Sequence, residues 1–240
     1  MKPEKVPFKP TARNFSSFRN IATFSLPQNI YDDIAPPSAF ETIYKHENSS
    51  SGIDHQKKKI NRPFQYGDAS LSLYVFQKLK WKRGRFSSGM KYGVWYGALE
   101  EETSRLEILY HLLKQSKELF QNPKISDPQI VHQRVMLKAQ CRASRLVDLT
   151  KMPSIHAKLT DDNYVFCYSM GERAMRENMD AFFSPSARVS GGTCTPIFNP
   201  DTIQKDEIIY YFDFIVHRDM RVKYKKSQIE ALTIPSQWNI

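Results

Sequence analysis

A predicted strand that runs directly into a predicted helix constrains the fold of this chain most strongly. Residues 92–99, YGVWYGAL, place aromatic rings and a valine between glycines, a pattern typical of a β-strand. Residues 100–120 follow with an acidic first turn and lysines in the C-terminal half, which predicts a helix that ends before Pro123. Its apolar positions recur at helical spacing and predict a buried stripe of Leu106, Leu109, Tyr110 and Leu113.

Further strands and one further helix follow this pair. Residues 133–150 alternate well enough for one strand or two, and residues 171–179 form a short amphipathic pattern. Residues 195–199 and 208–219 are rich in β-formers and predict strands. The order of strands, helix, strands, helix and strands predicts a single mixed α/β or α+β domain.

The first quarter of the chain has a different character. Residues 1–65 are rich in Pro and Ser and show little periodicity. Ser38, with Glu41 three positions later, predicts the start of one short helix. We therefore expect an N-terminal arm over residues 1–65 and a catalytic domain over residues 66–240.

The net charge indicates the class of partner to expect, and the cysteines indicate the cellular compartment. Lys and Arg outnumber Asp and Glu by 35 to 25, a net charge of +10, which favours an anionic partner such as a nucleic acid, a phosphorylated small molecule, an acidic protein or a membrane surface. The three cysteines show no metal-ligand or disulfide spacing, which is typical of a reducing compartment. No signal peptide or window of about 18 apolar residues is present, so we expect a cytoplasmic protein without a membrane span.

Several common enzyme classes lack their motifs in this sequence. It contains no Walker A loop and no GxGxxG after a strand, which argues against a P-loop NTPase and a Rossmann domain. It has no GxSxG elbow, and its six histidines never fall in a zinc-ligand spacing. We therefore expect no metal site.

Three residues around the strand–helix pair suit an anionic nucleotide. Arg85 lies before the strand, and a guanidinium can donate two hydrogen bonds at once to a pyrophosphate. Tyr96 ends the aromatic strand and could stack on a heterocycle or bond to a ribose. Glu107 lies on the flank of the buried helical stripe, between core and cleft. Each also has an ordinary structural alternative: a surface charge, a core ring and a solvated acid.

The same residues carry a resemblance to a known family. GRFSSG, YGVWYGA and TSRLE are similar to the first motif of the RES domain, which occurs in Xre–RES toxin–antitoxin pairs, and they place its arginine, tyrosine and glutamate at Arg85, Tyr96 and Glu107. The segment from arginine to tyrosine is one residue longer than the family pattern. SPSARVSGGTCTPIFNP, residues 184–200, resembles the second motif and places the family's serine at Ser186. The resemblance covers roughly residues 30–220.

The resemblance implies an α+β fold like that of ADP-ribosyltransferase toxins, a split, twisted β core with flanking helices and NAD bound in a cleft. It implies that Arg85 holds the pyrophosphate or an acceptor phosphate, that Tyr96 stacks on and orients the substrate, and that Glu107 stabilises the sugar cation. Ser186 would bond to nicotinamide or to a phosphate, and Arg188 is a further candidate for binding NAD or a structural charge.

The resemblance also implies a function and its partners. We expect a toxin that consumes NAD as its substrate, by phosphorolysis with phosphate as co-substrate or by hydrolysis, and that an Xre-like antitoxin neutralises. Nucleic acid would then be contacted only through the antitoxin, and a homodimer is left open. Two alternatives remain: an ADP-ribosyltransferase on the same fold, and a basic nucleic-acid-binding module without catalysis, whose affinity would fall steeply with salt.

Overall fold

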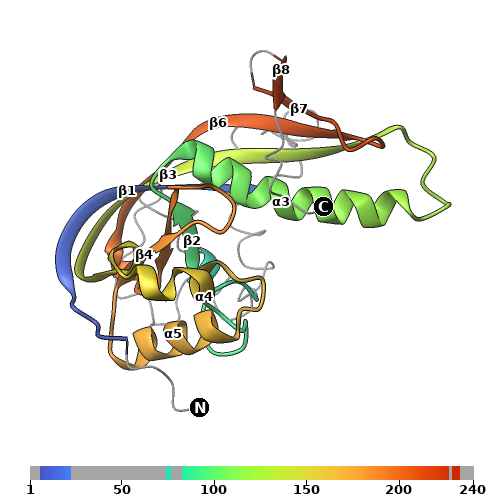
Figure 1. Ribbon diagram of the computed structural model, residues 1–240. Helices are drawn as coiled ribbons and strands as arrows, with labels where there is room; N and C mark the ends of the chain where they lie inside the picture. Colours follow the sequence, from blue (N-terminus) through green and yellow to red (C-terminus); the bar gives the residue numbers. More distant parts are fainter. Residues whose placement is uncertain (1–5, 23–73, 77–82, 227–228, 233–240) are drawn as a thin grey trace, which may run out of the picture.

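One mixed β-sheet and three α-helices make up most of the structure. The computed structural model describes residues 6–22, 74–76, 83–226 and 229–232 (Figure 1). The strands are β1 (Thr11–Ala22), β2 (Trp95–Ala98), β3 (Gln129–Asp148), β4 (Ala181–Pro185), β5 (Thr193–Ile197), β6 (Ile203–His217), β7 (Val222–Lys225) and β8 (Ile229–Leu232). The helices are α3 (Glu101–Phe120), α4 (His156–Thr160) and α5 (Val165–Arg176), and short 3-10 turns lie at Tyr74–Phe76, Leu149–Lys151, Pro153–Ile155 and Pro200–Thr202.

The described strands are hydrogen-bonded in the order β1-β2-β5-β4-β3-β6-β7-β8, and β1 also pairs with β3. The strands β1, β2, β5, β4 and β3 therefore form a closed ring of pairings. Strand β3 continues beyond the ring and pairs antiparallel with β6 over most of its length. This arrangement confirms the α+β class, because the sheet is mostly antiparallel and the helices lie beside it.

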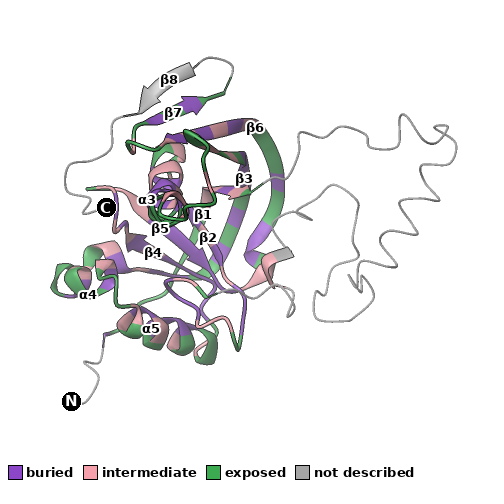
Figure 2. Ribbon diagram, turned by 90° about the vertical axis from the view of Figure 1, so that its right-hand side faces the viewer, coloured by how far each residue is buried: buried purple, intermediate pink, exposed green. Residues whose placement is uncertain are grey.

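Helix α3 covers the extended part of the sheet. Its buried residues Leu109 and Leu113 pack in one cluster with Met136 of β3 and with Phe212 and Phe214 of β6. In Figure 1 this helix runs alongside β3 and β6, while α4 and α5 lie below the ring of strands. Figure 2 shows that the strands between α3 and α5 are largely buried. Because Leu109 and Leu113 are buried against β3 and β6, apolar burial fixes where α3 crosses the sheet.

Helices α4 and α5 cover a second apolar cluster. It contains Leu159 of α4, Met170 of α5, Phe182 of β4 and, from the chain before β2, Phe86. The rings of Phe86 and Phe182 meet edge to face with their centroids 5.8 Å apart. Because Phe86 follows Arg85 directly, this cluster also fixes the position of the first candidate residue.

Most regular elements from residue 92 onwards agree with the predictions made from the sequence. The predicted strand at 92–99 contains β2, the predicted helix at 100–120 is α3, and the strands at 133–150, 195–199 and 208–219 correspond to β3, β5 and β6. Residues 133–148 belong to the one strand β3 rather than to two strands, and residues 149 and 150 begin a 3-10 turn. Helix α5 spans 165–176 rather than 171–179, so it begins earlier and ends sooner than expected. In α3, Leu112 is buried as well, whereas Leu106 is only partly buried.

Strand β1 lies in the predicted N-terminal arm. It pairs with β3 from Thr11↔Leu146 to Ala22↔Arg134, so part of the arm belongs to the sheet. Ser17 of β1 accepts a hydrogen bond from Trp95 Nε1 at 2.8 Å and shares one with Thr195 at 2.6 Å, which ties β1 to β2 and β5. The predicted helix at Ser38 lies outside the described residues, and the boundary between residues 65 and 66 stays a prediction.

Replacing Gly171 with alanine should destabilise the fold. Alanine is normally favoured over glycine within a helix by about 1 kcal/mol. A Cβ at Gly171, however, would lie 2.1 Å from the Phe86 carbonyl oxygen and 2.6 Å from the Tyr92 hydroxyl. Helix α5 would have to move away from the turn that carries Arg85. We expect Gly171→Ala to lower the free energy of unfolding by about 2 kcal/mol in a denaturant titration.

Gly84→Ala is the matched control, because a Cβ at Gly84 meets no atom within 4 Å. Its free energy of unfolding should stay within about 0.5 kcal/mol of the wild type. Equal stability of the two variants would contradict the close packing of α5 on Phe86.

Candidate active site

A tight turn before β2 positions Arg85. Gly84 and Ser87 exchange two backbone hydrogen bonds, of 2.8 and 3.2 Å, and leave Arg85 and Phe86 at the tip of the turn. The Tyr92 hydroxyl donates to the Phe86 carbonyl at 2.8 Å, and the Ser87 hydroxyl donates to the Tyr92 carbonyl at 2.8 Å. With Phe86 anchored in the core, the neighbouring guanidinium is held in one place.

The guanidinium of Arg85 is buried and only partly paired. Its Nη1 donates to the carbonyls of Leu159 and Asp161, at 3.0 and 2.6 Å, and the group lies 4.6 Å from the centre of the Tyr164 ring. Its Nη2 is buried without a hydrogen-bond partner in the part of the chain that the structure describes. A buried guanidinium nitrogen without a partner is costly, so we expect a ligand oxygen to accept from it.

Tyr96 lies on the same side of the sheet as Phe86, the neighbour of Arg85. Side chains alternate between the two faces of β2. Trp95 is therefore buried with apolar residues of β3 and β5, while Tyr96 packs against the cluster that contains Phe86. The Tyr96 hydroxyl is buried beside the Cys194 thiol and makes no hydrogen bond of good geometry with any described residue. Burial, Cys194 and Glu107 raise the pKa of Tyr96 well above its usual value, so the hydroxyl keeps its proton.

Glu107 faces inward from α3 and is only 7% exposed. Three groups donate to its Oε1: the Ser186 hydroxyl at 2.5 Å, the Ala187 backbone N–H at 3.0 Å and the Cys194 thiol at 3.5 Å. None of the residues that the structure describes donates to Oε2. Among the described residues, the carboxylate is therefore held through one of its two oxygens.

Ser186 and Arg188 lie in the turn between β4 and β5. The Ser186 hydroxyl accepts from the backbone N–H groups of Arg188 and Val189, at 3.1 and 3.0 Å, and donates to Glu107. A Cβ at Gly192 would come within 2.7 Å of the Thr103 hydroxyl, so only glycine lets this turn pack so closely on α3. The structure thus places Ser186 as the residue that orients Glu107, whereas the sequence suggested contact with nicotinamide or phosphate.

The candidate residues interact through their charges. Burial alone would lower the pKa of Arg85, but Tyr96, Tyr164 and Glu107 outweigh this effect and raise it. Arg85, Tyr96 and Glu107 therefore share one site although they come from a turn, a strand and a helix. Their catalytic roles stay predictions.

Sequence reasoning missed several residues of this site. Cys194 is fully buried, and burial beside Glu107 raises the pKa of its thiol well above the usual value, so it acts as a neutral donor. His111 lies one helical turn after Glu107 and interacts with Arg188, Arg85 and Asp162. The spacing of four residues from Glu107 was the available signal for His111. Nothing in the sequence indicated Asp162.

The charge state of His111 should make stability depend on pH. Although the residue as a whole is exposed, burial of its ring, together with Arg188 and Arg85, lowers the pKa of His111 below its usual 6.5. Glu107 and Asp162 oppose this shift. As the pH falls, the His111 ring is protonated at a higher pH in the unfolded chain than in the folded protein. Its contribution to stability is therefore complete above pH ~6.5 and is lost as the pH falls below this value. Denaturant titrations from pH 7 to 5 should show a smaller loss for His111→Asn than for the wild type.

His132 gives an internal reference for this measurement. Its pKa is also lowered, by burial and by Arg134, so it adds a stability loss of the same sign that His111→Asn keeps. Identical pH profiles for the variant and the wild type would show that His111 is not held neutral by the site.

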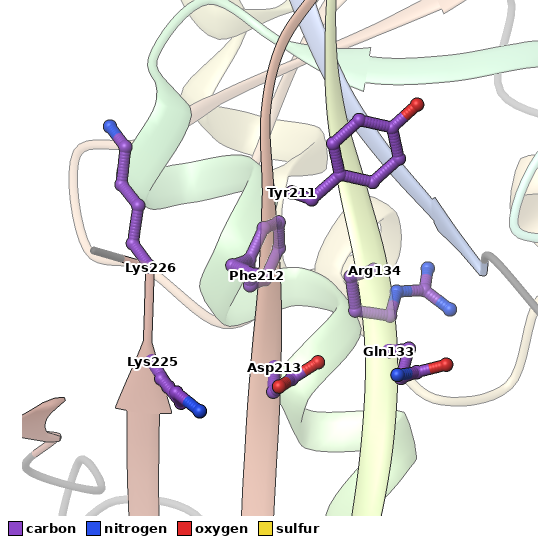
Figure 3. Close-up of a pocket in the computed structure, with 7 residues that line it drawn as sticks. All are labelled: Gln133, Arg134, Tyr211, Phe212, Asp213, Lys225 and Lys226. Atoms are coloured by element: carbon purple, nitrogen blue, oxygen red, sulfur yellow. The ribbon is translucent and has the colours of Figure 1, made fainter. Parts of the chain in front are cut away.

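A pocket of about 160 Å³ lies away from these residues, on β3 and β6 and at the end of β7 (Figure 3). Arg134, Lys225 and Lys226 make its lining basic, with Asp213 as the acid among the lining residues. Arg134 donates from Nε to the Asn20 side-chain oxygen at 3.0 Å and is thereby tied to β1. None of Arg85, Tyr96, Glu107, Ser186 and Arg188 lines this pocket, and the nucleic-acid-binding alternative stays an untested prediction.

Comparison with known proteins places the site in a family. Residues 52–217 match the family model of the RES domain, a span that contains Arg85, Tyr96, Glu107 and Ser186. The chain belongs to the RES domain family. The match confirms the resemblance seen in the two sequence motifs, and the paired motifs of this RES domain are the segments that meet around Glu107.

Other comparisons are more distant. A solved structure, the crystal structure of the M. tuberculosis MbcT–MbcA toxin–antitoxin complex, contains a chain that is 10% identical to this RES protein with a TM-score of 0.44, covering 85% of this chain and 86% of that one. No curated protein sequence matches the chain. In the described residues, no helix is long and apolar enough to span a membrane.

Proposed function

We propose that this RES-family chain is an enzyme that consumes NAD by breaking the bond between nicotinamide and ribose. The observation that carries the proposal is the grouping of Arg85, Tyr96 and Glu107 in one site. Arg85 Nη2 and the Tyr96 hydroxyl are buried without a hydrogen-bond partner among the described residues, and Glu107 is held through Oε1. A cation, a ring with a hydroxyl and a carboxylate are what a dinucleotide with a labile sugar bond requires.

Each group has a part in this chemistry. Arg85 would donate from Nη2 to the pyrophosphate, since its Nη1 is already used by the protein. Tyr96 would orient the nicotinamide ribose through its protonated hydroxyl. Glu107 would stabilise the positive charge that develops on the ribose as the bond breaks, with Ser186 fixing its direction.

The bond changes balance without a strong acid. The electron pair of the C1′–N bond goes to the ring nitrogen of nicotinamide, which leaves as a neutral molecule because it was a cation in NAD. In phosphorolysis a phosphate oxygen forms the new bond at C1′. In hydrolysis a water oxygen forms it and releases a proton to solvent.

Products distinguish the reactions. Purified protein should release nicotinamide from NAD, and mass spectrometry should find ADP-ribose 1″-phosphate for phosphorolysis or ADP-ribose for hydrolysis. With labelled NAD, label on protein bands would support the ADP-ribosyltransferase alternative instead. No product in either phosphate-containing or phosphate-free buffer, with the fold intact, would refute the proposal.

We further propose that this activity makes the chain the toxin of a toxin–antitoxin pair. The RES resemblance supports an Xre-like antitoxin as its partner, and the net charge of +10 suits an acidic antitoxin surface. Expression in bacteria should stop growth and deplete NAD, and Glu107→Gln should do neither. Growth arrest by Glu107→Gln as strong as that by the wild type would contradict this role.

A further inference from the structure

The loop between α4 and α5 covers both candidate anion-binding arginines. The last turn of α4 binds Arg85 through the Leu159 carbonyl, and the loop binds it through the Asp161 carbonyl. The Tyr164 ring of the loop lies against the same guanidinium. Asp162, which follows Asp161 in the loop, binds Arg188 through its carboxylate. The segment from Leu159 to Tyr164 therefore contacts the guanidinium groups of both Arg85 and Arg188.

The carboxylate of Asp162 is held by three groups from other elements. Arg188 Nη2 donates to Oδ1, the Tyr110 hydroxyl donates to Oδ2 at 3.0 Å, and Lys114 Nζ lies 3.8 Å from Oδ2. The Arg188 guanidinium also stacks 3.5 Å from the centre of the Tyr110 ring. Burial would raise the pKa of Asp162, but Arg188, Tyr110 and Lys114 outweigh it and lower the pKa, so the group is an anion.

Arg188 and Asp162, the two partners of this contact, differ in how far their side chains are exposed. The side chain of Arg188 is 8% exposed, and its backbone N–H is fixed by Ser186. The side chain of Asp162 is 54% exposed and reaches the site from a surface loop. Two cations and one hydroxyl donor surround a single negative charge, so a more highly charged anion would match these donors better.

We propose that Arg188, Lys114 and Tyr110 form a phosphate-binding subsite beside Glu107, and that Asp162 occupies it until a phosphate group displaces it. The subsite takes a phosphate, either one of the dinucleotide phosphates or inorganic phosphate. Its place in catalysis rests on the proposed function, but phosphate binding can be measured without turnover.

Calorimetric titration with pyrophosphate tests the displacement. Asp162→Asn removes the competing charge and should tighten pyrophosphate binding about tenfold relative to the wild type. Asp127→Asn is the matched control, because it makes the same chemical change at an exposed position between α3 and β3, outside the loop that contacts Arg85 and Arg188. Equal affinities for the two variants, or weaker binding by Asp162→Asn, would overturn the proposal.

A second pair of variants tests the subsite without disturbing the loop. Lys114→Gln should weaken pyrophosphate binding about threefold, while Lys117→Gln, an exposed lysine on the same helix, should leave it unchanged. Equal affinities for these two variants would overturn the subsite even where Asp162→Asn fails to fold.

Titrations with ADP and with inorganic phosphate show which phosphate the subsite binds. If the subsite holds a phosphate of the dinucleotide, Asp162→Asn should tighten ADP binding, and ADP should compete with inorganic phosphate. If it holds the co-substrate, inorganic phosphate should still bind at saturating ADP. Either result supports the subsite, whereas no effect of Asp162→Asn on either ligand contradicts it. Nicotinamide release is scored separately, so the subsite and the proposed function can fail independently.

Discussion

Replacing Glu107 with glutamine should lower the rate of NAD consumption by roughly 10²–10³-fold, because the charge that opposes the developing ribose cation is lost. The fold should persist, since the amide oxygen of glutamine can accept from Ser186 and Ala187 as Oε1 of Glu107 does. Initial rates of nicotinamide release at saturating NAD measure the loss in kcat directly. We expect the free energy of unfolding to change by no more than about 1–2 kcal/mol.

Glu118→Gln gives the matched control, because it makes the same chemical change on an exposed position of α3. Its kcat should equal that of the wild type. If Glu107→Gln kept the wild-type rate while folded, Glu107 would have no part in the chemistry, and the hydrogen bonds to its Oε1 would be purely structural.

Arg85→Lys should weaken NAD binding strongly although it keeps the positive charge. The guanidinium binds two protein carbonyls through Nη1 and leaves Nη2 for the ligand, a division that a single ammonium group cannot reproduce. Loss of one charge-assisted hydrogen bond corresponds to a KM about 10–100-fold higher. Because the pyrophosphate is bound in both the ground state and the transition state, kcat should change less than KM.

Arg83→Lys serves as the control for this variant. Arg83 lies two residues earlier, on the surface, and donates to the Tyr168 hydroxyl at 2.7 Å. The change at Arg83 should leave KM within about twofold of the wild type, as is usual for a surface pair. An equal KM for Arg85→Lys and the wild type would show that Nη2 does not meet the substrate.

The sequence predicted the elements with strong local patterns. The segment of β2 has β-forming aromatic residues and a valine between glycines, and α3 has a helical apolar period, so the placement of Tyr96 and Glu107 on them followed from local rules. Arg85 and Ser186 lie in turns, where periodicity says nothing. The chemistry of a guanidinium made Arg85 a candidate, whereas only the family motif indicated Ser186. Their meeting with Glu107 depends on the closed pairing of β2, β5, β4 and β3, which no local pattern encodes.

Other features could not be predicted from the sequence because they too depend on contacts between distant segments. Strand β1 has many polar residues, and it becomes a strand because β3 offers a long edge to pair with. The loop that carries Asp162 has the composition of an ordinary turn. Its contact with Arg188 joins residues 26 positions apart through tertiary packing alone.

Nicotinamide release from NAD by the purified, folded chain tests the central claim most directly. We predict steady release by the wild type, and loss of that release in Glu107→Gln, with the phosphate dependence of the rate separating phosphorolysis from hydrolysis. Absence of release by the folded wild type with and without phosphate, or equal release by Glu107→Gln, would contradict the account.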